Sequence, residues 1–538
     1  MSLKTNLSLK EKIGQLFMCG FEGTTPSNEI VDLIQNYYIG GVIYFSRNIT
    51  NTKQVFQLSN SLQELSLKST SIPLTVSIDQ EGGMVARIIH DVTLSPGNMA
   101  LGSTRNIDYT KKLASIVGEE LRLLGINMNF APCIDVNNNP KNPVIGVRSY
   151  GENPQLVSEF GIAAVEGYQN SNISAVVKHF PGHGDTNVDS HLGLPIIPHS
   201  IDRLVHLELM PFQQTIQQNV DAVMVAHVAF PAIDEAIVPS TLSETIVTDL
   251  LRKKLNYNGV VMTDCMEMKA IIDHYGIEEA AILAIEAGND LVLVSHTYER
   301  QKAAIEAVEK AVENGRISID RINESVDRLL KLKSKRELAT WEKDWNLAKS
   351  KIAKEEHVSL AREVSEKSIT IVKDDLGILP LKNKKTLVIW PEVNVTTEVD
   401  ETINQNVTLG GELVHKLSFV KEVVIQLIVD DQKIKELCNE SSQFEQVIIC
   451  TYNANETNNQ GKLVQQLVEK SCAKVIAVAL RSPYDLRYYN CVKTYLTIYE
   501  SRDLAVQSLA KTLLGEGQPT GLLPIRINDQ FSLGWKKE

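Results

Sequence analysis

Apolar, β-branched runs alternate with longer segments of helical spacing through roughly the first 335 residues, and this alternation constrains the fold most. Helical segments between successive strands are typical of βα units, which build a parallel sheet. The expected strands are residues 40–45, 74–79, 127–132, 174–180, 222–227, 259–264 and 291–295. Seven or so strands in this length favour a closed (β/α)8 barrel of the TIM type over an open sheet.

Most of these runs stop abruptly at a side chain that can take part in chemistry. The residues at the strand ends are Asp79, Lys178, His179, His227, Asp264 and, one residue beyond its strand, His296. In a (β/α)8 barrel the carboxyl ends of all strands meet on one face, where the active sites of such enzymes lie. A single strand can end at a polar residue because a loop begins there, but five such endings favour an active site.

The last third of the chain repeats the alternation. Expected strands at 387–390, 423–429, 447–450, 475–480 and 495–498 are separated by helical stretches, which predicts a second domain with an α/β sandwich fold. Between the two units, residues 333–356 are rich in Lys and Glu, and this pattern predicts a connecting helix that packs Trp341 and Trp345 on the barrel. We therefore expect a catalytic barrel at 1–335, a linker at 336–360 and the sandwich domain at 361–538.

Composition excludes several classes of partner. The chain holds 54 basic and 66 acidic residues, a net charge of −12, and no basic run of the kind that binds nucleic acid. Neither GxGxxG nor GxxxxGK occurs in the last third, so the sequence gives no support for nucleotide binding there, and we expect no cofactor. The N-terminus lacks the apolar core of a signal peptide and no later segment is long enough to span a bilayer, so we expect a cytoplasmic protein without a membrane partner. Nothing in the sequence indicates an oligomeric state.

The stretch KHFPGHGDTNVDSH at 178–191 concentrates titratable side chains. One hypothesis is a metal cage of three histidines with an aspartate, drawn from His179, His183, His191, Asp185 and Asp189. The HxHxDH and HExxH patterns of metal-dependent hydrolases are absent, however, and Pro181 and Gly182 prevent a helical arrangement of the first two histidines. We therefore expect no metal, and a metal-dependent hydrolase remains as an alternative.

An acid/base pair explains the same stretch with fewer assumptions. In Asp189-x-His191 the carboxylate can hold one imidazole nitrogen, which leaves the other nitrogen to exchange a proton with a substrate. Lys178 and His179 at the strand end would supply hydrogen-bond donors, and the glycines let the loop approach a ligand.

Glycoside cleavage would need a second carboxylate to meet the developing positive charge on the sugar. Asp264, at the end of an apolar strand, is the best candidate. The alternative for Asp264 is a structural role as a helix N-cap, a frequent function of Asp between a strand and a helix.

Five segments together carry a family resemblance. They are GGVIYFSRN (40–48), IDQEGGMVAR (78–87), NFAPCIDVNNNPKNPVIGVRSYG (129–151), KHFPGHGDTNVDSHLGLP (178–195) and VVMTDCMEMKAI (260–271). In this order they resemble the β-N-acetylglucosaminidase branch of glycoside hydrolase family 3 across nearly all of the first 335 residues. The resemblance implies a retaining exo-β-N-acetylglucosaminidase that needs no metal and acts on small oligosaccharides, either chitin oligosaccharides or cell-wall muropeptide fragments.

The resemblance also implies roles for single residues. Asp264 matches the catalytic nucleophile, and Asp189 with His191 matches the general acid/base dyad of this branch. The positions that match contacts to the sugar ring and the N-acetyl group are Asp79, Arg87, Arg148, Lys178 and His179. For Arg87 and Arg148 the alternative is an ordinary salt bridge.

Some positions depart from the family pattern or have no assigned role. Met84 and Val147 stand where many relatives carry Arg and Asp, which leaves the subsite preference open. Glu81 and Asp135 are expected to orient loops or to be purely structural. The roles of four other titratable residues stay open: we expect His183 and Asp185 to shape their loop, and His227 and His296 to be core or neighbouring histidines rather than catalysts.

Two other functions remain as alternatives on the same residues. One is a β-N-acetylglucosaminide phosphorylase, because a histidine acid/base does not repel phosphate as a glutamate would. The other is a sugar-binding protein without catalysis.

Overall fold

A computed structural model describes residues 6–187, 193–393 and 406–537 of the chain. Its first part is a closed barrel of eight parallel strands, in which β1 pairs with both β2 and β10. In chain order these strands are β1 (Phe17–Cys19), β2 (Gly41–Tyr44), β3 (Thr75–Ile78), β6 (Met128–Asn129), β7 (Ser174–Phe180), β8 (Ala222–Val225), β9 (Val260–Cys265) and β10 (Leu291–Val294). The predicted (β/α)8 barrel is confirmed.

Seven of the eight strands coincide with the runs expected from the sequence, and β1 is the exception. Its three residues are too short for a recognisable strand pattern, yet they close the barrel because Phe17 lies opposite Val292 and Met18 lies opposite Gly41. Most strand residues are fully buried, since helices cover the outside of the sheet and side chains fill its centre.

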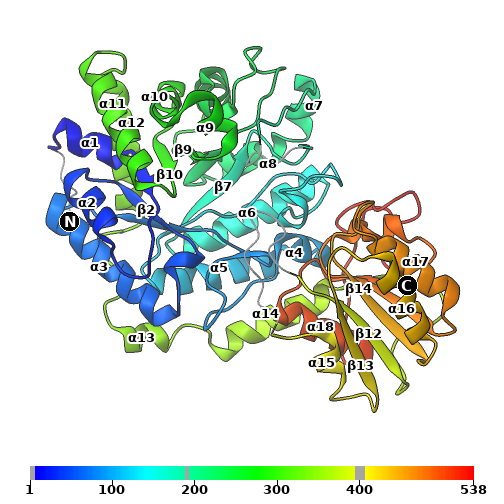
Figure 1. Cartoon of the computed structure of the whole chain (residues 1–538). Coiled ribbons are helices and arrows are strands. Elements are labelled where there is room, and N and C mark those ends of the chain that lie inside the picture. The colour runs from blue at the N-terminus through cyan, green and yellow to red at the C-terminus, as the bar shows by residue number, and fades with distance from the viewer. Residues whose placement is uncertain (1–5, 188–192, 394–405, 538) are drawn as a thin grey trace.

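Helices surround the barrel (Figure 1). They are α1 (Leu9–Gln15), α2 (Asn28–Asn36), α3 (Thr52–Thr70), α4 (Asn98–Thr104), α5 (Ile107–Leu123), α6 (Pro154–Asn170), α7 (Ile201–His206), α8 (Met210–Gln217), a π-helix (Thr245–Lys254), α9 (Lys269–Tyr275), α10 (Ile277–Ala287), α11 (Tyr298–Glu313) and α12 (Ile319–Lys335). Local sequence explains several starts: at α6, for example, the Asn153 side chain accepts a hydrogen bond from Leu156 N–H, and Pro154 occupies the first turn. None of the helices in the described part of the chain combines the length and hydropathy that a membrane span requires.

The continuous connecting helix expected at 333–356 is wrong. Helix α12 ends at Lys335, and Glu337 adopts a left-handed conformation with φ of 49°. Lys335 and Arg336 both form ion pairs with Asp221, so contacts with the barrel override the local helical pattern. Two helices follow, α13 (Trp345–Lys349) and α14 (Glu355–Ser368). The Trp345 ring packs against Phe56 of the barrel, as predicted, with ring centroids 5.5 Å apart.

The last part of the chain, which we call the C-terminal domain, is built on a six-stranded sheet. Its order is β11-β16-β15-β14-β12-β13, with β11 antiparallel to β16 and all other pairs parallel. The strands are β11 (Thr370–Asp374), β12 (Thr386–Pro391), β13 (Val420–Ile425), β14 (Gln446–Thr451), β15 (Lys474–Ala479) and β16 (Thr494–Thr497). The sequence predicted β12, β14, β15 and β16; it placed β13 a few residues too late, at 423–429, and it missed β11. Helices α15 (Leu409–Leu413) and α18 (Asp503–Leu514) pack together, as do α16 (Asp431–Ser441) and α17 (Gln460–Lys470), and the two pairs lie beside the sheet in Figure 1. The predicted α/β architecture is confirmed.

The C-terminal domain shares its apolar core with a few residues of the barrel chain. Met84, Met99, Ala100 and Val147 belong to the same buried cluster as the core of the C-terminal domain. Met84 and Val147 are the two positions where the family resemblance implied Arg and Asp, and both side chains are buried in this cluster. Helix α14 runs across residue 360, and the division of the chain at 335 and 360 stays a prediction.

Candidate active site

A short hairpin follows β3 at the carboxyl face of the barrel. It consists of β4 (Gln80–Gly82) and β5 (Val85–Ala86), so Asp79 precedes it and Arg87 follows it. The Gln80 side chain closes the base of the hairpin, because its Oε1 accepts hydrogen bonds from the Arg87 and Ile88 N–H groups at 2.9 and 3.1 Å. Asn129 of β6 accepts a third bond from Gln80 N–H at 2.9 Å. The hairpin is therefore fixed to the barrel at its base.

Lys178 joins the hairpin to β7. Its Nζ lies 2.6 Å from Asp79 Oδ1 and 2.7 Å from Glu81 Oε1, and the side chain is 2% exposed. Arg148 donates two parallel hydrogen bonds to the Glu81 carboxylate at 3.0 and 2.7 Å, a bidentate geometry. Arg87 Nη2 lies 3.5 Å from Asp79 Oδ2. Four predicted sugar-binding residues thus meet in one ionic network whose centre is Glu81, and the salt bridges considered for Arg87 and Arg148 are present.

The network keeps its charges although it is buried. Burial opposes ionisation of Glu81, but the charges of Arg148 and Lys178 overcome this effect and hold the pKa of the carboxyl well below its ordinary value. Burial likewise disfavours the ammonium of Lys178, yet Asp79 and Glu81 raise its pKa above the ordinary value. These groups present fixed positive and negative charges at the carboxyl end of the barrel.

Asp135 organises the next part of the site. Its Oδ2 accepts hydrogen bonds from His179 N–H at 3.1 Å and from His179 Nδ1 at 2.7 Å, and Oδ1 accepts one from His183 N–H at 2.6 Å. Burial disfavours the Asp135 carboxylate, but the neighbouring His179 lowers its pKa, so the carboxylate acts only as an acceptor. His179 Nδ1 must then carry the proton, and its Nε2 can face a ligand. The sequence singled out His179 but gave Asp135 no definite role.

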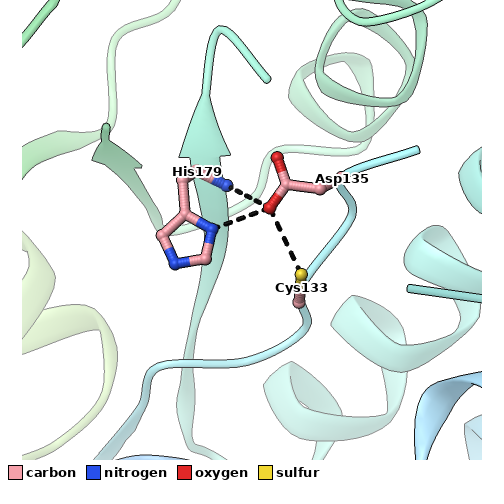
Figure 2. A group of neighbouring side chains, drawn as sticks. All are labelled: Cys133, Asp135 and His179. Atoms are coloured by element: carbon pink, nitrogen blue, oxygen red, sulfur yellow. Dashed lines mark hydrogen bonds and ion pairs between the residues drawn. The ribbon is translucent and has the colours of Figure 1, made fainter. Parts of the chain in front are cut away.

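Cys133, Asp135 and His179 come close enough to contact a single ion (Figure 2), with their ligand atoms all within 4.8 Å of one another. Their hydrogen bonds argue for a different role. Asp135 Oδ2 already accepts from both His179 groups and from Cys133 Sγ at 3.3 Å. Burial, assisted by Asp135, raises the pKa of the Cys133 thiol well above its ordinary value. These contacts make the three residues a hydrogen-bonded group that orients His179.

Asp264 lies at the end of β9, in the position expected for a nucleophile on rigid backbone. Its Oδ1 accepts a hydrogen bond from Cys265 N–H at 2.7 Å. Helix α9 begins at Lys269 with Met268 as its N-cap, so the interpretation of Asp264 as an N-cap is wrong. The charge of Asp264 acts on the ring of His183, which places the end of β9 beside the loop that follows β7.

The predicted acid/base pair, Asp189 and His191, lies outside the described residues. Asp185 accepts hydrogen bonds from His199 Nε2 at 2.6 Å and Arg203 Nη2 at 2.5 Å, so its carboxylate is engaged by two groups outside the 178–191 stretch. Asn142 Nδ2 donates to the carbonyls of His183 and Gly184 at 2.8 and 2.9 Å. These contacts support the prediction that Asp185 and His183 shape the loop.

His183 is also unsuited to be the acid at neutral pH. Burial lowers the pKa of its ring to about 4, and the neighbouring His179 acts in the same direction. Its Nδ1 lies 3.0 Å from the Thr186 hydroxyl.

The two remaining strand-end histidines differ from each other. His227 is fully buried, with Nδ1 2.7 Å from the Thr241 hydroxyl and Nε2 2.9 Å from the Cys265 carbonyl, so it is the core histidine that we expected. His296 is exposed rather than buried in the core, so of the two expected roles it fits that of a neighbouring histidine: its ring lies on Phe45 with centroids 5.2 Å apart, and Nδ1 is 3.2 Å from Arg47 Nη1.

Phe45 and Arg47 were missed by sequence reasoning. The Arg47 guanidinium lies 4.4 Å from the Phe45 ring centroid, and that of Arg87 lies 5.9 Å from it, so this group borders the ionic network. A signal was available, because Phe45 and Arg47 both stand in GGVIYFSRN, one of the motifs that carry the resemblance.

Comparisons with known proteins agree with this geometry. The model of the glycosyl hydrolase family 3 N-terminal domain matches residues 8–332. The chain is 32% identical over 558 residues to β-hexosaminidase A of Pseudoalteromonas piscicida, covering 95% of this chain and 93% of that protein. It is 27% identical to a β-N-acetylglucosaminidase/β-glucosidase of Cellulomonas fimi, covering 98% and 94%. Among solved structures, a family 3 β-N-acetylglucosaminidase from Paenibacillus sp. str. FPU-7 superposes with a TM-score of 0.93 and 45% identity, covering 97% of this chain and 99% of that one.

Fold, site and matches define the class of protein as a barrel glycoside hydrolase. The chain belongs to glycosyl hydrolase family 3.

Proposed function

We propose that the protein is an exo-acting, retaining β-N-acetylglucosaminidase that removes terminal non-reducing N-acetylglucosamine from small oligosaccharides. The observation that carries the proposal is the position of Asp264 at the end of β9, on the barrel face that also holds the charged network of Asp79, Glu81 and Lys178. The names of the relatives, β-hexosaminidase and β-N-acetylglucosaminidase, support the choice of sugar. The two proposed substrate classes are chitin oligosaccharides and muropeptide fragments, because both can carry N-acetylglucosamine at the non-reducing end.

Asp264 is the proposed nucleophile. Its carboxylate attacks the anomeric carbon while the bond from that carbon to the leaving oxygen breaks, and His191 gives its proton to this oxygen. In the second displacement, His191 takes a proton from water and the water oxygen bonds to the anomeric carbon. The bond between that carbon and the Asp264 carboxylate breaks at the same time. Two displacements at one carbon give net retention. Asp189 stabilises the imidazolium of His191, and for both residues the assignment rests on their match to the family motif.

The ionic network is proposed to bind the sugar. Asp79 accepts hydrogen bonds from ring hydroxyls, while Lys178 and Arg87 donate to them. Arg148 holds Glu81 in place beside the same pocket. His179, whose Nδ1 proton is held by Asp135, offers Nε2 to the sugar. Because these groups are already paired and fixed before a sugar arrives, little reorganisation is required on binding.

Hydrolysis of an aryl β-N-acetylglucosaminide, measured against the aryl β-glucoside, tests the proposal. We expect the wild type to prefer the acetylated substrate. Asp264→Ala should lower kcat by more than ~10³-fold, about 4 kcal/mol of transition-state stabilisation. Asp273→Ala, an exposed aspartate on α9, is the matched control and should stay within about two-fold of the wild type.

Two results would overturn the proposal. Failure of the wild type on the acetylated substrate would remove the assigned specificity, and an active Asp264→Ala variant would remove the nucleophile. The same assay with inorganic phosphate added separates hydrolysis from phosphorolysis, because only the latter releases a sugar 1-phosphate.

A further inference from the structure

The hairpin β4–β5 is too small to hold its own shape. It has three residues in one strand and two in the other, and isolated two-stranded hairpins are marginal in water even when longer. Yet it carries Glu81, the centre of the ionic network, and it is flanked by Asp79 and Arg87. Gln80 and Asn129 hold its base, as described above, so what fixes its tip decides where these side chains stand.

The tip, Gly83 and Met84, is held by the C-terminal domain. Arg502 Nε donates to the Gly83 carbonyl at 3.0 Å, and Arg502 Nη2 donates to the Met84 carbonyl at 3.2 Å. Both acceptors are backbone groups, so these bonds fix the path of the chain rather than one side chain. Arg502 is the N-cap residue of α18 and is 7% exposed, so its guanidinium projects from the start of a regular helix in a buried position.

Two neighbours of Arg502, Glu500 and Ser501, lie against the same tip. Glu500 Oε2 accepts a hydrogen bond from Gly97 N–H at 3.1 Å, and a Cβ atom added to Gly83 would lie 2.5 Å from that oxygen. Gly83 also has a φ of +55°, so no other residue fits there without strain. The Ser501 hydroxyl lies 4.0 Å from Met84 Sδ, and Met84 belongs to the apolar core of the C-terminal domain.

We propose that Arg502, with the loop 500–502, positions the sugar-binding hairpin, so that the C-terminal domain is part of the active-site architecture without touching the substrate. This inference rests on the proposed function of Asp79, Glu81 and Arg87 as the sugar-binding side of the pocket. Arg502 is a positioning residue: without its two bonds the tip keeps the bond from Gly83 N–H to the Ser95 carbonyl at 3.0 Å and the packing of Met84, but both tip carbonyls lose these donors and the tip can shift. A displacement of about 1 Å at such groups is enough to impair a site.

The test compares Arg502→Met with a matched arginine. Arg105 also bridges the two parts of the molecule, since Nη2 donates to the Leu523 carbonyl at 2.7 Å and Nη1 donates to the Gly102 carbonyl at 2.7 Å, but it does not bond to the hairpin. Arg105→Met therefore measures the general effect of losing a bond between the domains. Both variants are made in the full chain, and their thermal unfolding is recorded beside their kinetics.

We expect Arg502→Met to raise KM for the aryl glycoside ~10-fold or more with kcat within about three-fold, because the hairpin binds the sugar while Asp264 and the acid/base pair lie on other segments. Arg105→Met should leave KM within about two-fold even if it unfolds at a similarly lowered temperature. Arg502→Lys keeps the charge and one donor nitrogen, so its KM should lie between the values for Arg502→Met and Arg105→Met. This variant also tests the inference if Arg502→Met does not fold.

An unchanged KM in Arg502→Met and Arg502→Lys, or an equal rise in Arg105→Met, would overturn the inference. The wild type is assayed first on both aryl glycosides, and the variants are then measured on whichever one it hydrolyses. A wild type that prefers the β-glucoside would therefore count against the proposed function alone, while the comparison of Arg502 with Arg105 would still decide the inference.

Discussion

Glu81 of the barrel and Glu500 of the C-terminal domain are both at least 95% buried, yet their carboxyl groups behave in opposite ways. Glu81 contacts two cations, Lys178 and Arg148, and its pKa is held well below the ordinary value. Glu500 accepts a hydrogen bond from a backbone N–H, and burial raises its pKa to about 7 because the charge of Arg502 offsets burial only in part. Asp485, after β15, resembles Glu500: burial raises its pKa to about 7 as well.

The difference teaches that partners, and not depth, decide whether a buried carboxyl is charged. Burial penalises the ionised form in both regions, and the effect is reversed at Glu81, where two cations bond directly to the carboxylate, but only offset in part at Glu500 by Arg502. The barrel has gathered such cations at the site proposed to bind the sugar, and they favour the ionised form of Glu81. In the C-terminal domain Glu500 and Asp485, whose pKa values are raised to about 7, gain protons as the pH falls below neutrality.

The largest expected effect follows from breaking the paired carboxylate. Glu81→Gln leaves Lys178 and Arg148 buried beside a neutral amide, and removing one partner of a buried ion pair costs about 3–5 kcal/mol of unfolding free energy. We expect kcat/KM to fall by ~100-fold or more as the network rearranges. Urea denaturation and steady-state kinetics measure the two effects.

An exposed pair provides the control for Glu81. Glu166 forms a salt bridge with Lys111, and both side chains are more than 40% exposed. Glu166→Gln should therefore change the free energy of unfolding by less than about 1 kcal/mol. Equal losses in the two variants would contradict the role given to pairing in the barrel.

Asp135→Asn extends the comparison to a second buried carboxylate of the barrel. The amide has one acceptor oxygen instead of two, and its NH2 group then faces donors that the carboxylate accepted from, so it cannot hold His179 Nδ1, His179 N–H and His183 N–H together. We expect kcat/KM to fall about 10- to 100-fold through loss of His179 orientation. Cys133→Ser, which keeps a donor to Asp135, is the control and should remain close to the wild type. A normal kcat/KM in Asp135→Asn would show that His179 needs no such support.

The smallest effect is expected at Glu500, the carboxyl that is not held between two cations. Its pKa is shifted in the opposite direction to that of Glu81, so its contribution to stability depends on pH with the opposite sign. The pKa of Glu500 is about 7 in the folded protein and 4.5 ordinarily, so between these values the folded chain binds a proton that the unfolded chain does not. The stability that Glu500 contributes is thus fully present below about pH 4.5 and is lost as the pH rises through about 7. Glu500→Gln cannot titrate, so from about pH 5.5 to about pH 7 its unfolding free energy should fall by about 1–2 kcal/mol less than that of the wild type.

Urea denaturation at both pH values measures this effect, and Asp485→Asn should reproduce it. Glu456→Gln, an exposed change in the same domain, should keep the wild-type pH dependence. A Glu500→Gln variant with the wild-type slope would show that Glu500 is ionised in the folded protein throughout this range.

Much of the fold could be predicted from the sequence because most strands are buried on both faces and are therefore continuous apolar runs. The failures have local causes. Strand β1 is three residues long, and its place is set by pairing with β10 rather than by its own pattern. The Lys/Glu-rich segment after Lys335 has helical spacing, but the ion pairs of Lys335 and Arg336 with Asp221 direct the chain elsewhere.

The sequence indicated most residues of the site, but it did not indicate which of them contact one another. Strand endings and motifs indicated Asp79, Lys178 and Asp264, and the structure brings Asp79 and Lys178 into contact. The central role of Glu81 depends on partners 67 and 97 residues away in the chain, and only the folded barrel brings them together. Asp135 was underestimated for the same reason. Asp189 and His191 lie outside the described residues, and their role stays a prediction from the motif.

The central claim, double displacement at the anomeric carbon through Asp264, is tested most directly by the configuration of the first product. Proton NMR of the wild type during hydrolysis of an aryl β-N-acetylglucosaminide follows the anomeric signal before mutarotation equilibrates the two forms. The account predicts that the β-anomer of N-acetylglucosamine appears first and the α-anomer only later. Initial release of the α-anomer would mean a single displacement by water and would contradict a covalent intermediate on Asp264.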